Sequence, residues 1–159
     1  MENSARLSGE RSLAGRTVLA IFAHPDDESL ACGGTLARLA DAGARVVVLC
    51  ASRGEAGSTS DPSLVPDGNL GVVRTRELRN AAAVLGVADV LIFDYPDGDL
   101  RWDRVQELHA EIVSAIRQYR PDAVITFAED GLYWHLDHIG VHERTYTAVQ
   151  SFGADAPPR

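Results

Sequence analysis

The stretch IFAHPDDESLACGG, at residues 21–34, places one imidazole and three carboxylates within five positions. Its apolar start is typical of a buried strand, and the polar side chains follow directly as His24, Asp26, Asp27 and Glu28. Carboxylates this close repel one another and are costly to bury, so the grouping indicates a nearby cation. The start of a helix would explain the acidic residues, which favour its positive end, but it would not explain the histidine.

A second group of such residues lies in WHLDHIGVHE, at residues 134–143, which holds three histidines and an aspartate. On a helix His135, His138 and His142 can share one face, although any one of them alone would be an ordinary histidine. With Asp137, and with the histidine and second aspartate of the first stretch, they form a mixed set of nitrogen and oxygen ligands. Such a set suits zinc, and catalytic zinc sites combine three protein ligands with one open position.

The pattern of apolar residues predicts the elements that must position these two groups. Continuous apolar runs predict four buried strands, at 16–23, 44–51, 89–95 and 122–129. Helical spacing predicts four intervening helices, at 27–43, 70–86, 102–120 and 135–152. This alternation is typical of an α/β fold, a Rossmann-like three-layer αβα sandwich with a mostly parallel sheet.

Ligands of such sheets bind beyond the carboxyl ends of the strands. All four predicted strands deliver polar residues there, at 24–28, 52–55, 94–99 and 129–138. A dinucleotide site would need glycines directly after the first strand, and the sequence has none there before Gly33, so this interpretation is weak. The long turn-rich segment at 52–69 is expected to be functional or mobile.

Composition limits the classes of function. The chain has 159 residues, of which 45% are hydrophobic, and this predicts one globular domain at 16–152 after a flexible lead-in at 1–15. The net charge of −8 argues against a nucleic-acid or anionic-membrane binder, which would need a basic face. No apolar run approaches the ~18 residues of a membrane span. The first residues lack an apolar signal core, so we expect a cytoplasmic protein.

Four stretches carry a family resemblance: AHPDDESLACGGTLA, SRGEAG, RTRELRNAAAVLGV and HLDH. In this order, and placed on these strands, they resemble the LmbE-like, or PIG-L-type, zinc deacetylases, which remove an acetyl group from N-acetylglucosaminyl compounds. The resemblance runs from residue 16 to about 150. It implies a zinc-dependent N-deacetylase that acts on a small N-acetyl amino sugar conjugate, with Zn²⁺ or another divalent metal as its cofactor.

The resemblance also implies roles for individual residues. His24, Asp27 and His138 match the zinc ligands of the family. Asp26 matches the general base that takes a proton from the attacking water. His135 matches the residue that stabilises the tetrahedral oxyanion or protonates the leaving amine.

Further residues are expected around this centre. Asp137 is expected to hold His135 in orientation and to favour its protonated form. Tyr133 matches a tyrosine that some members use to polarise the carbonyl. Three more residues are candidates for binding the substrate: Arg74, Glu55 and Asp97. An exposed helix arginine would equally explain the first of these, and turn chemistry would explain the last.

Members of this family usually continue well past the helix that carries H-x-D-H, so we expect a truncated or minimal member. Two alternatives to a working deacetylase stay open: an incomplete fragment or metal-binding module of this fold, and another metal-dependent amidase or esterase. Asp26 and His135 favour an enzyme, since metal binding alone needs neither. The edge strand AVITF carries no charge, so we also expect self-association as a homo-oligomer, or marginal stability.

Overall fold

A four-stranded sheet forms the centre of the protein in the computed structural model, which describes residues 12–65 and 68–152. The strand order is β3-β2-β1-β4, and every pairing is parallel. The bounds of the strands are Thr17–Phe22 for β1, Arg45–Ser52 for β2, Asp89–Tyr95 for β3 and Ala123–Ile125 for β4. Most of the expected lead-in and the end of the chain after residue 152 lie outside the described residues.

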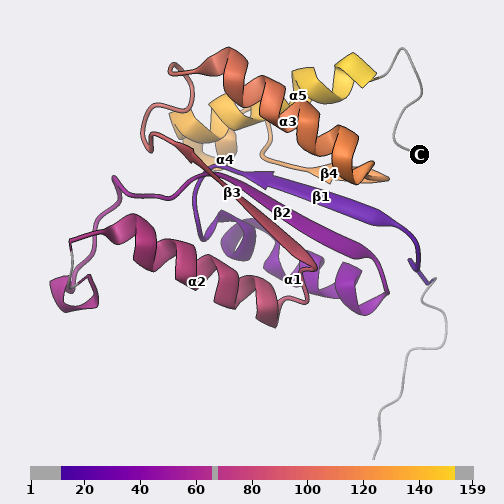
Figure 1. Cartoon of the computed structure of the whole chain (residues 1–159), viewed down its shortest axis with the longest axis horizontal. Helices are drawn as coiled ribbons and strands as arrows, with labels where there is room; N and C mark the ends of the chain where they lie inside the picture. The colour runs from indigo at the N-terminus through magenta and orange to yellow at the C-terminus, as the bar shows by residue number, and fades with distance from the viewer. Residues whose placement is uncertain (1–11, 66–67, 153–159) are drawn as a thin grey trace, which may run out of the picture.

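Helices cover both faces of the sheet, which gives three layers (Figure 1). α1 and α2 lie on one face, and α3 and α5 lie on the other. The bounds of the helices are α1 Asp27–Asp41, η1 Pro62–Leu64, α2 Leu70–Val84, α3 Val105–Tyr119, α4 Gly131–Trp134 and α5 Leu136–Phe152. The predicted αβα sandwich with a parallel sheet is therefore confirmed. Within the described ranges, no helix combines the length and apolarity that a membrane crossing requires.

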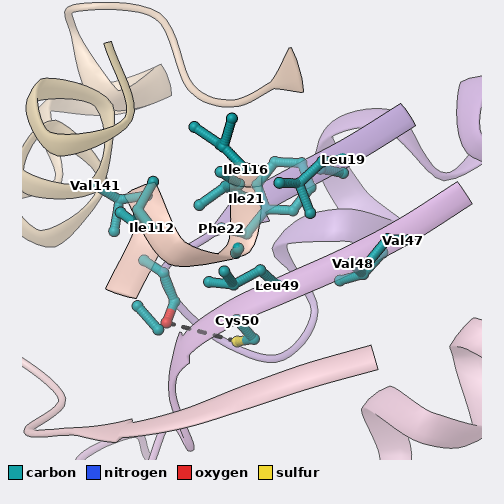
Figure 2. Close-up of a cluster of buried hydrophobic side chains, with 14 of the residues drawn as sticks. Leu19, Ile21, Phe22, Val47, Val48, Leu49, Cys50, Ile112, Ile116 and Val141 are labelled. Carbon is teal, nitrogen blue, oxygen red and sulfur yellow. Dashed lines mark hydrogen bonds between the residues drawn. The ribbon is translucent and has the colours of Figure 1, made fainter. Parts of the chain in front are cut away.

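Buried side chains pack on both faces of the sheet, and Figure 2 shows the cluster between the two central strands and the helices of one face. Leu19 and Ile21 of β1 and Leu49 of β2 are fully buried, and Ile112 of α3 and Val141 of α5 pack in the same cluster. Each fully buried side chain of this kind contributes about 1.5–3 kcal/mol. The two central strands are thus a firm base for the loops that follow their carboxyl ends.

The last part of the chain differs from the sequence prediction in two places. The strand expected at 122–129 ends at Ile125, and the ring of Phe127 instead stacks on His138 with the centroids 4.0 Å apart. The helix expected at 135–152 is preceded by the short α4, where Leu132 and Trp134 adopt positive φ angles of 74° and 66°. This left-handed backbone separates α4 from α5.

Candidate metal centre

The candidate site lies at the carboxyl end of β1, where the strand order reverses. β2 lies on one side of β1 and β4 lies on the other, so the segments that follow β1 and β4 open around a common point. His24 follows β1, Asp27 begins α1, and His138 lies in the first turn of α5. Three elements therefore converge where the sequence predicted.

The three predicted ligands lie in direct contact with one another. The Nδ1 atom of His24 is 3.3 Å from the Nε2 atom of His138. One carboxylate oxygen of Asp27 is 3.6 Å from His24 Nδ1, and the other is 3.3 Å from His138 Nε2. All three residues are buried. Two imidazole nitrogens and one carboxylate facing the same point are a donor set that fits a divalent cation such as Zn²⁺.

Two wider groups of possible ligands share His24. The ligand atoms of His24, His135 and His138 all lie within 4.8 Å of one another, and so do those of His24, Asp97 and Asp137. The two ring nitrogens of His24 serve different partners, because Nδ1 contacts His138 whereas Nε2 contacts Asp97 and Asp137. His24 is therefore the centre of the site.

Asp137 lies behind His24. One oxygen of its carboxylate is 3.0 Å from His24 Nε2, and the fully buried carboxylate also accepts the backbone N–H groups of Gly98 at 2.8 Å and Leu100 at 3.0 Å. A carboxylate in this position holds the hydrogen of the imidazole on Nε2 and leaves Nδ1 free for a metal. The two backbone donors in turn fix the carboxylate.

This placement corrects the expected partner of Asp137, which is His24 and not His135. Only the backbone N–H of Asp137 contacts His135, by donating to its Nδ1 atom at 3.2 Å. His135 has an extended backbone before α5 begins, whereas Asp137 lies in the first turn of α5. Burial lowers the pKa of His135, and the neighbouring His138 and His24 lower it further. The charge of Asp137 does raise the pKa of His135, as expected, but burial and the two histidines outweigh it.

Contacts within the site strongly perturb the pKa values of the ligands in the metal-free chain. Burial lowers the pKa of His24, but the hydrogen bonds to Asp137 and Asp27 outweigh it and raise the pKa to about 9. Burial raises the pKa of Asp27, but the hydrogen bonds from His138 and His24 hold it well below its ordinary value.

Asp26 is adjacent to the ligand Asp27 in the sequence, but its carboxylate contacts Arg74. Its side chain is 57% exposed, and one carboxylate oxygen lies 3.1 Å from Nη2 of Arg74. Its φ angle of 111° is unusual for a residue with a side chain, and strain of this kind is concentrated at functional sites. Burial raises the pKa of Asp26, the charge of Arg74 lowers it, and the charge of Asp27 raises it, with a net increase. A raised pKa makes the carboxylate a stronger base.

Arg74 is a structural part of the site wall. Its guanidinium donates to the carbonyl oxygens of Gly54 at 2.8 Å and Pro25 at 2.6 Å, besides its contact with Asp26. A Cβ atom at Gly54 would lie 2.1 Å from Nη1 of Arg74 and would displace the guanidinium, and the φ angle of 66° would strain any other residue. The side chain of Arg74 is only 18% exposed, so the alternative of an exposed arginine on a helix surface does not hold.

The other two candidates for substrate binding contact each other. The carboxylate of Glu55 accepts the backbone N–H of Asp97 at 2.9 Å, and Glu55 is exposed. The side chain of Asp97 is only 9% exposed, and it contacts His24. Asp97 therefore faces the interior of the site, unlike an ordinary aspartate of a turn.

The remaining candidates lie on the open side of the site. Tyr133 is 62% exposed, and its ring centroid lies 5.8 Å from that of His135 and 5.3 Å from that of His138. His135 is partly buried, and its ring stacks on His138 with a centroid separation of 4.5 Å. These two side chains border the space from which a ligand would approach.

Three further residues support the site. The carbonyl oxygen of Gly131 accepts a hydrogen bond from His138 Nδ1 at 3.2 Å, and a Cβ atom at Gly131 would lie 2.9 Å from Ile139. Glu28 is 1% exposed and accepts the backbone N–H of Asp26 at 3.1 Å. Phe127 supports the other face of His138. Only Glu28 lies in a recognisable motif, so the others become visible only in the folded chain.

Comparisons with known proteins agree with this geometry. Residues 19–149 match the family described as PIG-L: GlcNAc-PI de-N-acetylase. A 1D-myo-inositol 2-acetamido-2-deoxy-alpha-D-glucopyranoside deacetylase of Kineococcus radiotolerans is 39% identical over an alignment of 168 positions that covers 88% of this chain and 46% of that protein. The chain spans about half the length of the curated relatives it matches.

Solved structures show the same likeness. The N,N'-diacetylchitobiose deacetylase from Pyrococcus horikoshii, complexed with its inhibitor MPG, aligns with a TM-score of 0.73 and 32% identity over 86% of this chain and 50% of its own. The zinc inhibited form of teicoplanin deacetylase Orf2 aligns with a TM-score of 0.71 and 25% identity over 86% of this chain and 64% of its own. The chain therefore belongs to the PIG-L, or LmbE-like, family of GlcNAc-PI de-N-acetylases.

Proposed function

We propose that this chain is a metal-dependent hydrolase that removes the acetyl group from an N-acetylglucosaminyl conjugate. The observation that carries the proposal is the convergence of His24, Asp27 and His138, with Asp26 held beside them by a different partner. The names of the relatives, which describe deacetylases of acetamido sugars, support the choice of substrate class.

The metal in this proposal is Zn²⁺, or another divalent cation with the same ligand preferences. His24 would contribute Nδ1, Asp27 its carboxylate and His138 Nε2, because these atoms face one another. When bound there, such a cation polarises the amide carbonyl and makes water acidic enough to lose a proton near neutral pH. Asp137 would keep His24 in the required tautomer.

Asp26 would take the proton from the attacking water. Its contact with Arg74 holds the carboxylate in place, and its raised pKa suits a base that later returns the proton to the leaving nitrogen. One group would thus serve both steps, and the protons balance: the water loses one and the released amine gains it.

His135 would stabilise the oxyanion that forms on the acetyl carbonyl. Its Nδ1 atom accepts the backbone N–H of Asp137, so the neutral ring carries its hydrogen on Nε2. A neutral donor suits the lowered pKa of His135 better than a protonated acid does. Tyr133 would add a second donor to the carbonyl oxygen. Arg74 and Glu55 remain candidates for contacts to the sugar.

The test is acetate release from an N-acetylglucosaminyl inositol by the purified chain, together with its metal content. We expect one equivalent of metal, release of acetate, loss of activity with a chelator and recovery with Zn²⁺. An O-acetyl sugar, assayed in parallel, separates an amidase from an esterase. Stoichiometric metal without acetate release would support the alternative of a metal-binding module.

A further inference from the structure

Asp97 joins two parts of the site that are far apart in the sequence. One oxygen of its carboxylate lies 3.0 Å from Nε2 of His24. The other oxygen accepts the backbone N–H of Ala56 at 2.9 Å, and the backbone N–H of Asp97 donates to the carboxylate of Glu55 at 2.9 Å. Asp97 therefore contacts both the imidazole of His24 and the substrate loop, as we call residues 53–57.

The substrate loop is attached on its other side to the proposed base. Arg74 donates to the carbonyl oxygen of Gly54 at 2.8 Å, and the same guanidinium contacts Asp26 at 3.1 Å. The contacts form a continuous path from Asp26 through Arg74, the substrate loop and Asp97 to His24. A displacement of the loop would therefore disturb both the base and the metal ligand.

The carboxylate of Asp97 is not needed to set the tautomer of His24. Asp137 already accepts the single hydrogen of Nε2, and two backbone N–H groups fix that carboxylate. A second carboxylate at Nε2 adds little to the choice of tautomer. The other oxygen of Asp97, however, accepts the backbone N–H of Ala56, and no other group of the site makes this contact in the described structure. What Asp97 adds is the connection to the substrate loop.

We propose that Asp97 is a positioning residue that couples the substrate loop to the metal ligand His24. The proposal rests on the metal centre of the proposed function and deepens it, since it assigns Asp97 a role other than direct contact with the sugar. A bound metal would restrain the imidazole of His24. The imidazole would in turn restrain the carboxylate of Asp97, and that carboxylate holds the substrate loop through Ala56. Because linkage is reciprocal, a ligand that orders the loop also tightens the binding of the metal.

The discriminating variant is Asp97→Asn. An asparagine keeps one acceptor oxygen, so it can accept from Ala56 or from His24 but not from both. The readouts are amide hydrogen exchange in a peptide that covers 53–57, with and without Zn²⁺, and the Zn²⁺ affinity measured against a competing chelator. In the unmodified chain we expect Zn²⁺ to slow the exchange of this peptide. In Asp97→Asn we expect that response to vanish and the affinity to fall about tenfold or more.

Asp94→Asn is the matched control. Asp94 lies at the same end of β3 and contacts the same loop, through Nε of Arg53 at 2.7 Å, but its side chain is 81% exposed. We expect faster exchange of the loop in this variant while the response to Zn²⁺ and the metal affinity stay unchanged. Loss of the response in Asp94→Asn as well would mean that any loosening of the loop has this effect, and it would overturn the proposal.

A pair of variants at Glu55 covers the case in which Asp97→Asn does not fold. Glu55→Ala removes the acceptor of the Asp97 backbone N–H and should weaken the response to Zn²⁺, whereas Glu55→Gln keeps an acceptor and should preserve it. Equal responses in both would overturn the coupling. Two equivalents of metal in the unmodified chain and one in Asp97→Asn would instead make Asp97 a ligand. None of these readouts depends on acetate release, so failure of the proposed function remains a separate result.

Discussion

Asp26 and Asp27 are adjacent in the sequence, yet their carboxylates serve different partners. Asp27 is buried between His24 and His138, whereas Asp26 is 57% exposed and contacts Arg74. The left-handed backbone at Asp26 lies at the point where the two side chains diverge. One of the two neighbours is therefore placed to hold a cation, while the other stays free to exchange protons.

Replacing Asp26 with asparagine should separate these two roles. We expect Asp26→Asn to keep stoichiometric metal and to deacetylate ~10²–10⁴-fold more slowly, because the amide cannot accept the proton of water. Metal analysis and the rate of acetate release measure both effects. Normal turnover by this variant would exclude Asp26 as the base.

Removal of His24 should abolish the metal site. We expect His24→Ala to lose most of the bound metal, since His24 Nδ1 is one of the three converging donor atoms. The matched control is His109→Ala, which removes a partly buried histidine of α3 and should leave the metal content unchanged. Equal metal in the two variants would contradict the assignment of His24.

Metal uptake should release a proton and strengthen as the pH rises. The pKa of His24 in the metal-free chain is about 9, so this imidazole is protonated at pH 7 and must lose its proton to bind a metal. We expect the affinity to rise from pH 6 to about pH 9 and then to level off. Calorimetry at pH 7 in buffers of different ionisation enthalpy should detect about one released proton. An affinity that does not change over this range would contradict the prediction.

The free edge of β4 should promote self-association. Among the described strands β4 pairs only with β1, its sequence AVI carries no charge, and a cavity of about 290 Å³ lies beside it between Val124, Phe127 and Val149. We expect sedimentation to show a dimer or larger species at high concentration. Ala123→Lys should reduce it, because an edge lysine opposes strand pairing. Gln150→Lys, on the exposed side of α5, is the control. A monomer at all concentrations would contradict the prediction.

The parts of the fold that the sequence predicted well are those set by burial. β1 and β2 are almost fully buried, so their apolar runs mark them directly. The apolar run at 122–129 led to too long a strand, because Phe127 lies beyond the end of β4 and stacks on His138. The break before α5 was also missed, since beyond Gly131 the positive φ angles fall on Leu132 and Trp134, residue types that rarely adopt them.

The candidate site shows the same division. The strand pattern predicted that the two motifs would meet at one end of the sheet, and the family resemblance implied His24, Asp27 and His138 as the ligands among them. The partner of Asp137 was not predictable, since it comes from a different part of the chain and not from the neighbouring turn. Asp97 lies in a segment with the composition of an ordinary turn, and only its burial in the folded chain distinguishes it.

His24 and His138 touch across a separation of 114 positions in the sequence. A contact this remote forms only after β4 has joined β1 and α5 has docked, and such non-local contacts form slowly during folding. A nascent or partly folded chain that already contains His24 and Asp27 would therefore lack the third donor. Tight metal loading would be a late event in the life of the polypeptide, and it would distinguish molecules that have reached the native topology from those that have not.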